Sequence, residues 1–135
     1  MKCCICGKEI HGHPNSPAPI DGDYCCDECN LNVVVPYRLF LHSLGKKNIA
    51  MLIRPDKIEL VKPERKYFTL RELQTHVGGY IELYANAFDN VLTVVDEEGL
   101  LKELPYNRLT KKLFNFDLVG NVLICPIKIF ESPRR

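Results

Sequence analysis

The hydrophobic positions from residue 49 onward alternate with polar ones or form short apolar runs, and turn-forming residues separate these stretches. Both patterns are typical of β-strands, because alternate side chains of a strand face opposite sides of a sheet. The sequence predicts strands at 49–53, 58–61, 80–84, 91–95 and 119–125. Only a polar turn separates the strands at 80–84 and 91–95, so we expect these two to form an antiparallel hairpin.

Two segments between these strands have the spacing of helices. Residues 69–77 repeat apolar side chains at helical intervals, and Thr69 followed by Glu72 has the spacing of a capping box. Two glycines then end this short helix. Between residues 100 and 114, Pro105 divides a strand-like start from a second segment with helical spacing. The predicted fold class is therefore α+β, a mostly antiparallel sheet with one or two helices.

A further helix is predicted ahead of the sheet, from the second group of cysteines to the glycine at position 45. Pro36 predicts a kink or an interruption within it, because proline lacks an N–H and its ring clashes with the preceding turn. The helix has an apolar face, which we expect the rest of the chain to cover. We place a domain boundary after it, with a zinc-binding module and its helix at 1–45 and an α+β domain at 46–135.

Six of the seven cysteines lie near the start of the chain, at Cys3, Cys4, Cys6, Cys25, Cys26 and Cys29. No secretory apolar run precedes them, so metal binding is favoured over disulfides. Two C-x-x-C pairs, the first followed by glycine, are separated by 19 residues, which is the spacing of a four-thiolate zinc site. We assign the Zn²⁺ ligands as Cys3, Cys6, Cys26 and Cys29. Such a shell leaves no open position, so the zinc would be structural.

The doubled cysteines leave an alternative register in which Cys4 or Cys25 replaces a neighbouring ligand. The spacing favours the first assignment, because a single residue between Cys4 and Cys6 is too short to direct both sulfurs at one metal. His11 and His13 lie in the loop between the pairs and are further potential ligands. The knuckle, the loop and the helix together resemble a treble-clef or zinc-ribbon unit.

The composition limits what else the chain does. A length of 135 residues with 46% hydrophobic residues supports one main core and a small appendage. The formal net charge is +1, and the first 45 residues contain three basic and five acidic side chains, so charge does not favour nucleic-acid binding by the zinc module. No stretch approaches the ~20 apolar residues of a membrane helix. We expect a cytoplasmic protein.

Four motifs in the second part of the chain carry a family resemblance. They are Val77-Gly78-Gly79-Tyr80-Ile81-Glu82, Asp96-Glu97-Glu98-Gly99, Leu104-Pro105-Tyr106-Asn107-Arg108 and Gly120-Asn121-Val122-Leu123. With them, residues 48–128 resemble the bacterial and phage family numbered 3846 among the domains of unknown function. The cysteine motifs are similar to small zinc modules of short phage and gut-bacterial proteins. These resemblances imply a phage or mobile-element origin and supply no activity.

The sequence contains no recognisable enzyme pattern, because no nucleophile with its base, no pair of carboxylates and no open metal site can be assembled from local spacing. We therefore expect a non-enzymatic binding or adaptor protein with a protein partner. Turns commonly carry recognition residues, and the candidate contact surface comprises Glu97, Tyr106, Asn107 and Arg108. The alternatives are nucleic-acid binding by the zinc module and sequestration of a small nucleotide by the α+β domain.

Overall fold

The computed structural model describes residues 1–130 and contains one five-stranded sheet. The strands are β1 Ala50–Ile53, β2 Ile58–Val61, β3 Ile81–Phe88, β4 Val91–Asp96 and β5 Val122–Pro126. Their order across the sheet is β2-β1-β5-β4-β3, and every neighbouring pair is antiparallel. The predicted α+β fold with an antiparallel sheet is confirmed. The hairpin is also present, although β3 continues past the predicted end at 84.

The helical elements are α1 Asp27–Cys29, the π-helical segment η1 Asn30–Val34, α2 Val35–Ser43, α3 Leu70–Val77, α4 Arg108–Phe114 and the 3-10 turn η2 Ile127–Ile129. The first three follow one another without a break and form the helix predicted ahead of the sheet. Its irregularity is the π-helical segment, which ends two residues before Pro36. In this wider turn the Val35 N–H donates to the Asn30 carbonyl oxygen, so the predicted interruption is a π-helical turn next to the proline.

The capping box predicted for α3 is present with both of its hydrogen bonds. The Glu72 N–H donates to Thr69 Oγ1 at 3.1 Å, and the Thr69 N–H donates to Glu72 Oε1 at 2.8 Å. The helix ends at Gly78, whose φ of +97° lies in the left-handed region that favours glycine. Local sequence signals therefore determine both ends of α3.

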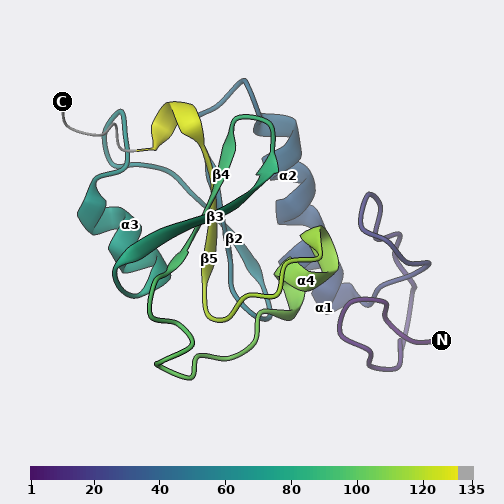
Figure 1. The fold of residues 1–135 in the computed structure, drawn as a ribbon. Helices are drawn as coiled ribbons and strands as arrows, with labels where there is room; N and C mark the ends of the chain where they lie inside the picture. Colours follow the sequence, from purple (N-terminus) through teal and green to yellow (C-terminus); the bar gives the residue numbers. More distant parts are fainter. Residues whose placement is uncertain (131–135) are drawn as a thin grey trace.

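Helices cover both faces of the sheet (Figure 1). The continuous helix of α1, η1 and α2 lies on one face together with α4, whereas α3 lies on the other. Alternate residues of the central strands enter the two cores, as in β1, where Met51 and Ile53 face the first core and Ala50 and Leu52 the second. None of the helices in residues 1–130 is long and apolar enough to cross a bilayer.

The packing does not divide at the predicted boundary between residues 45 and 46. Val34 and Phe40 of the preceding helix are fully buried and belong to the same core as Ile53 and Ile124 of the sheet. The buried cysteine Cys29 belongs to it as well. The reason is that this face of the sheet is covered by that helix, so the two predicted parts share one core.

Candidate metal centre

The first cysteine pair lies on a tight backbone turn. The Cys3 N–H donates to the Lys8 carbonyl oxygen at 2.8 Å, and the Gly7 N–H donates to the Cys3 carbonyl oxygen at 2.9 Å. Gly7 has a φ of +80°, which residues with a Cβ rarely adopt. The turn directs the N–H groups of Ile5 and Cys6 at Cys3 Sγ, at 3.4 and 3.5 Å. This is the geometry expected of a zinc knuckle.

The second cysteine pair begins the long helix. Cys26 is the N-cap of α1, and its Sγ accepts a hydrogen bond from the Cys29 N–H at 3.4 Å. The preceding loop is held by a β-bridge between Asn15 and Cys25, and the Asn15 side-chain amide donates to Asp27 Oδ1 at 2.9 Å. The start of the helix thus fixes the positions of both cysteines.

The proline-rich loop between the two pairs is attached to the helix by an arginine. Arg38 on α2 donates from Nε to the Ala18 carbonyl oxygen at 2.7 Å and from Nη2 to the Ser16 carbonyl oxygen at 2.9 Å. Ile20 of the same loop is buried in the core that α2 shares with the sheet. The loop therefore depends on α2 for its position.

The structure brings together Cys3, Cys6, Cys26 and Cys29, whose Sγ atoms all lie within 4.8 Å of one another. Cys6 Sγ and Cys26 Sγ are 3.9 Å apart. Four thiolates around a tetrahedral Zn²⁺ lie about 3.8 Å apart when each Zn–S bond is about 2.3 Å long. The donor set and its spacing thus fit a four-thiolate metal site.

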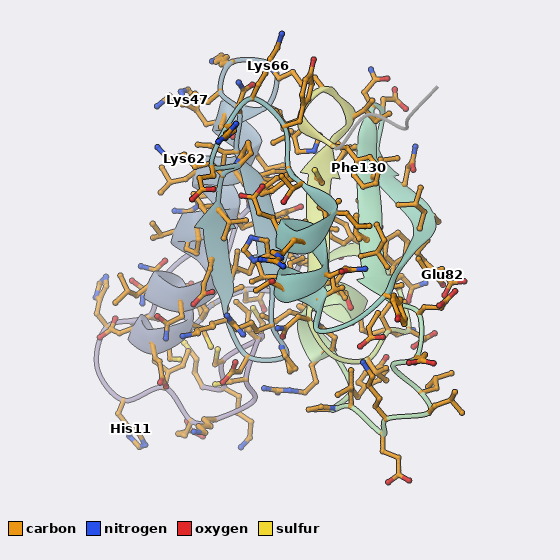
Figure 2. All side chains as sticks on the ribbon, turned by 90° about the vertical axis from the view of Figure 1, so that its left-hand side faces the viewer. His11, Lys47, Lys62, Lys66, Glu82 and Phe130 are labelled. Atoms are coloured by element: carbon orange, nitrogen blue, oxygen red, sulfur yellow. The ribbon has the colours of Figure 1, made fainter. Side chains whose placement is uncertain are left out.

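The alternative ligands of the sequence analysis lie outside this cluster. Cys25 is fully buried, and burial raises the pKa of its thiol to about 11. Cys4 packs beside Gly22, where an added Cβ would come within 2.4 Å of the Cys4 side chain. His11 and His13 are exposed, and His11 extends away from the fold (Figure 2). Cys4 and Cys25 are therefore packing residues in this structure.

The four thiols of the cluster differ in how readily they ionise. Burial opposes ionisation of Cys3, but backbone hydrogen bonds from Cys6, Cys26 and Ile5 outweigh it and lower the Cys3 pKa to about 6. Burial raises the pKa of Cys29, and the neighbouring thiols raise it further. Burial also raises the pKa of Cys26. A cation at the centre of the cluster would favour the ionised form of all four, as metal binding requires.

The four residues of the predicted contact surface do not form one patch. Glu97 lines a groove beside β3 and β4. Arg108 lines a different hollow, a polar cleft of about 380 Å³ that also contains Cys6 and Cys29. Tyr106 is 45% exposed, and its hydroxyl donates to Asp117 Oδ1 at 2.6 Å. Tyr106 thus contacts Asp117, which lines the same groove as Glu97, whereas Arg108 is accessible in a different hollow.

Asn107, the fourth residue of that surface, is fully buried and is not available for recognition. Its Oδ1 accepts from the Thr110 N–H at 2.9 Å and caps α4. Its Nδ2 donates to the carbonyl oxygens of Ile53 at 2.9 Å and Gly120 at 2.8 Å. These hydrogen bonds connect α4 to the end of β1 and to the residues before β5. The role of Asn107 in the turn at 105–108 is therefore structural.

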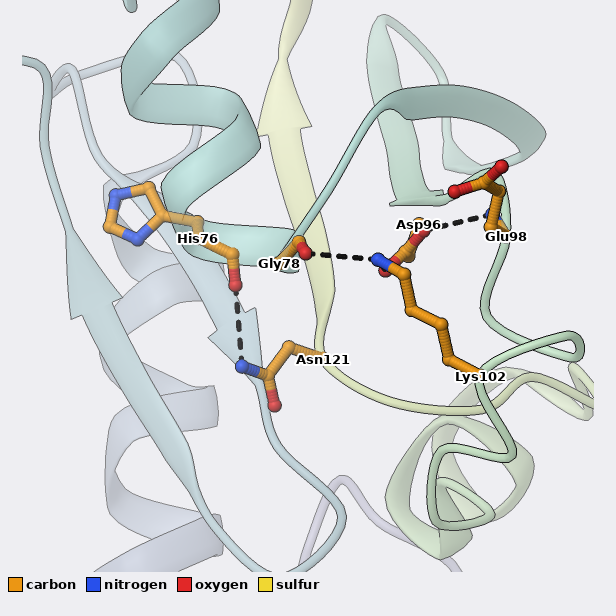
Figure 3. A network of polar contacts seen from close by, with 6 residues as sticks. All are labelled: His76, Gly78, Asp96, Glu98, Lys102 and Asn121. Carbon is orange, nitrogen blue, oxygen red and sulfur yellow. Dashed lines mark hydrogen bonds and ion pairs between the residues drawn. The ribbon is translucent and has the colours of Figure 1, made fainter.

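An ion pair between the buried Asp96 and the exposed Lys102, which the sequence analysis did not identify, holds the loop after β4 (Figure 3). Lys102 Nζ lies 2.7 Å from Asp96 Oδ2 and 3.1 Å from the Gly78 carbonyl oxygen. An added Cβ at Gly79 would lie 2.5 Å from Lys102 Nζ and 3.0 Å from Asp96 Oδ2, so a larger residue here would require the ion pair to shift. The two consecutive glycines were the only sequence signal of this contact. Asn121 nearby donates to the His76 carbonyl oxygen at 3.3 Å.

No curated protein and no solved structure matches the chain significantly. A family model described as Domain of unknown function (DUF3846) matches residues 47–129, which include the whole sheet, α3 and α4. Because the match covers more than half of the chain, the protein belongs to the DUF3846 family.

Proposed function

We propose that the protein is a non-enzymatic, zinc-stabilised binding protein whose metal module supports one face of the DUF3846 domain. The observation that carries the proposal is the four-cysteine cluster, which has the spacing of a closed thiolate shell and shares its core with the sheet. Soft thiolate ligands in a tetrahedral arrangement favour Zn²⁺. A closed shell leaves no site for water or substrate, so the metal would act on stability.

The surroundings of the other reactive side chains support a non-enzymatic role. The His76 ring lies edge-on to the buried Phe68 ring, with 5.9 Å between centroids, and burial lowers the His76 pKa. Cys125 is fully buried, and burial raises the pKa of its thiol to about 12. Cys125 therefore lacks the accessible, activated environment that a nucleophile needs, and the half-buried His76 ring packs on an apolar side chain. Free thiols and a thiolate site both suit the reducing cytoplasm.

The metal proposal is tested by elemental analysis of the purified protein and two variants. We expect one Zn²⁺ per chain in the wild type and loss of most of it in Cys29→Ser, because a serine hydroxyl replaces one thiolate. Cys4→Ser is the matched control, since it changes a neighbouring cysteine outside the cluster and should retain full occupancy. Absence of zinc from the wild type, or equal occupancy in both variants, would contradict the proposal.

A second candidate function is nucleic-acid binding at a basic end of the molecule. The pairing of Ala50 with Val61 brings the segments before β1 and after β2 together. Figure 2 shows Lys47, Lys62 and Lys66 at this same end of the fold. Lys66 Nζ lies 5.4 Å from the ring centroid of Tyr67, an exposed aromatic side chain that a base can stack against. The fold thus brings together lysines that are up to 19 positions apart in the sequence.

This second function is tested by titrating single- and double-stranded oligonucleotides at several salt concentrations. Binding at the basic end predicts a steep loss of affinity with salt and a further loss in the Lys62→Glu/Lys66→Glu variant. The Lys2→Glu/Lys8→Glu variant is the control, because it makes the same charge change on the metal module. A larger loss in the control would place the contact on the module, and affinity independent of salt would exclude phosphate binding.

A further inference from the structure

The two edge strands of the sheet differ in how they are protected. β2 is four residues long and lies between Lys57 and Lys62, with Pro55 and Pro63 just beyond. Lysine and proline at an edge prevent a sheet from pairing with another chain. β3 forms the opposite edge and contains neither lysine nor proline in its eight residues. The β2 edge is therefore protected against pairing with another strand, whereas the β3 edge is not.

The backbone of β3 offers free hydrogen-bonding groups along its first half. The Glu97 N–H donates to the Tyr80 carbonyl oxygen at 2.8 Å. Because orientations alternate along an antiparallel pair, the polar backbone groups of Ile81 and Leu83 point away from β4. Within residues 1–130, no strand pairs with this outer side. A bulge follows Tyr84, so the regular platform is the segment before it.

An apolar groove of about 510 Å³ lies next to this platform. Its apolar lining comprises Tyr84, Val95, Leu100, Leu101, Leu118 and Val119. Leu100 and Leu101 are 81% and 83% exposed, and Tyr80, which lies on the same side of β3 as Tyr84, is 65% exposed. Apolar side chains gathered in this way are typical of an interaction site.

The rim of the groove is acidic. Glu82, Glu97 and Asp117 contribute carboxylates to its lining. In the part of the chain that the structure describes, neither Glu82 nor Glu97 takes part in an ion pair. Asp117 is 3.5 Å from Lys111 Nζ. Asp96 also reaches the groove, but its charge is paired with Lys102. The unpaired carboxylates favour a basic ligand.

We infer that β3 and its groove bind an extended segment of a partner protein, with apolar side chains in its middle and lysine or arginine at its ends. The segment would add a sixth strand to the sheet through the outward backbone groups of Ile81 and Leu83. Its apolar side chains would lie on Tyr84 and Leu101, and its basic ends would meet Glu82 and Glu97. This inference rests on the proposed binding function and names the class of partner.

A second copy of the chain fits this edge less well. Contact between two β3 strands would bring Glu82 and Glu97 of both copies into one interface, where like charges repel. The β2 edge of a second copy is basic, but the prolines on either side limit the ladder that it can form. The charges at the β3 edge and the prolines at the β2 edge therefore both favour a partner protein over a second copy of this chain.

The test is a titration of zinc-loaded, full-length protein with a fluorescein-labelled nonapeptide, lysine-lysine-valine-threonine-valine-threonine-valine-lysine-lysine. A peptide with glutamate in place of lysine is the charge control. We expect the lysine peptide to bind at least about tenfold more tightly at low salt, equivalent to about 1.4 kcal/mol. Amide chemical-shift changes on binding should be concentrated in residues 80–87 and 97–101. Shifts concentrated elsewhere, or equal affinity for the two peptides, would overturn the inference.

Two further comparisons separate strand addition from simple charge attraction. Two further peptides carry N-methyl groups on alternate amides, one on the odd-numbered and one on the even-numbered residues. Because only one of these two sets of amides faces β3, methylation of that set should abolish binding, whereas methylation of the other set should change the affinity less than threefold. Equal binding by both methylated peptides would overturn strand addition. Glu82→Lys should weaken binding about tenfold, whereas the control Glu64→Lys, on the far side of the sheet, should not.

Self-association gives an independent check on the occupant. At the concentrations of the titration, the molar mass of the protein in solution should be that of a monomer, with or without bound peptide. A dimer that the peptide does not dissociate would mean that a second copy covers β3, and would overturn the inference. A negative result in the peptide or mass measurements would not contradict the proposed zinc-stabilised role, because that role is tested separately by the zinc content of the protein.

Discussion

The two faces of the sheet are covered by different means. On one face, the core includes the cluster cysteines Cys3 and Cys29 together with Phe40 of α2. On the other face, Phe68 and Leu73 pack on the sheet, and no cluster cysteine takes part. The first face thus combines apolar burial with a four-cysteine cluster that fits a metal ion, whereas the second relies on apolar packing alone.

The comparison also separates what the two layers contribute to binding. The face with α3 is closed by a short helix whose ends are fixed by a capping box and a glycine. The face with the metal module leaves a polar cleft at Arg108 and borders the groove at Glu97. We therefore expect changes on the α3 face to affect stability only, and changes on the metal face to affect stability and recognition separately.

Metal removal should produce the largest effect. Chelation under reducing conditions should lower the free energy of unfolding by on the order of 5 kcal/mol, because the loop and the start of the helix lose their main link. Denaturant titration with and without chelator measures this. Hydrogen exchange should increase more in α2 than in α3. Equal increases in both helices would show that the two faces do not differ in their dependence on metal.

Phe68→Ala should have the next largest effect, and on the opposite face. The side chain is fully buried, so its truncation should cost about 3–5 kcal/mol through lost burial and the cavity left behind. Denaturant unfolding gives the cost, and elemental analysis of the same sample should show unchanged zinc content. Loss of zinc in this variant would mean that packing on the α3 face affects metal binding on the opposite face of the sheet.

Variants at the neighbouring residues Asn107 and Arg108 should distinguish a buried structural side chain from an exposed one. Asn107→Ala should cost about 2–4 kcal/mol, because it removes the cap of α4 and leaves two buried carbonyl oxygens without their donor. Arg108→Ala should change the free energy of unfolding by less than about 0.5 kcal/mol, since its side chain is exposed. If Arg108→Ala proves as costly as Asn107→Ala, the arginine is structural and is not a recognition residue.

The smallest predicted effect is a pH dependence on the α3 face. Burial opposes ionisation of Glu72, but N–H groups of Thr69 and Glu64 outweigh it and hold the pKa of its carboxyl below the usual range. This contribution to stability is therefore present above the unfolded glutamate pKa of about 4.3 and is lost as pH falls through the lower folded value. Glu72→Gln should flatten this part of the profile of unfolding midpoint against pH. An unchanged profile would contradict the assignment.

Sequence reasoning succeeded where the signal is local. The spacing of the cysteine pairs and the pair Thr69 and Glu72 indicate structures formed within a few residues, and both appear in the fold. It failed where a residue's role depends on distant segments. Asn107 resembles a surface turn residue until the ends of β1 and β5 meet it, and its bond to Ile53 spans 54 positions. The sequence predicted that the rest of the chain covers the apolar face of the helix, but not which strand residues share a core with Phe40.

The sequence also gave no indication of which strand would be an edge. Strand order depends on how β5 returns between β1 and β4, a long-range pairing that no local pattern records. The absence of lysine and proline from 81–88 is visible in the sequence, but it acquires meaning only once that segment lies at the edge. The groove beside it was found from the structure alone.

The π-helical segment η1 makes the helix intolerant of insertions and deletions. Its wider turn, closed by a bond from the Val35 N–H to the Asn30 carbonyl oxygen, lies between Cys29 of the four-cysteine cluster and the core residue Phe40. Deleting one residue here would shift everything before it by about 100° around the helix axis relative to α2. Either the cysteine would leave the cluster or the phenylalanine would leave the core. The number of residues in this segment, more than their identity, therefore sets the angle at which the metal module meets the sheet.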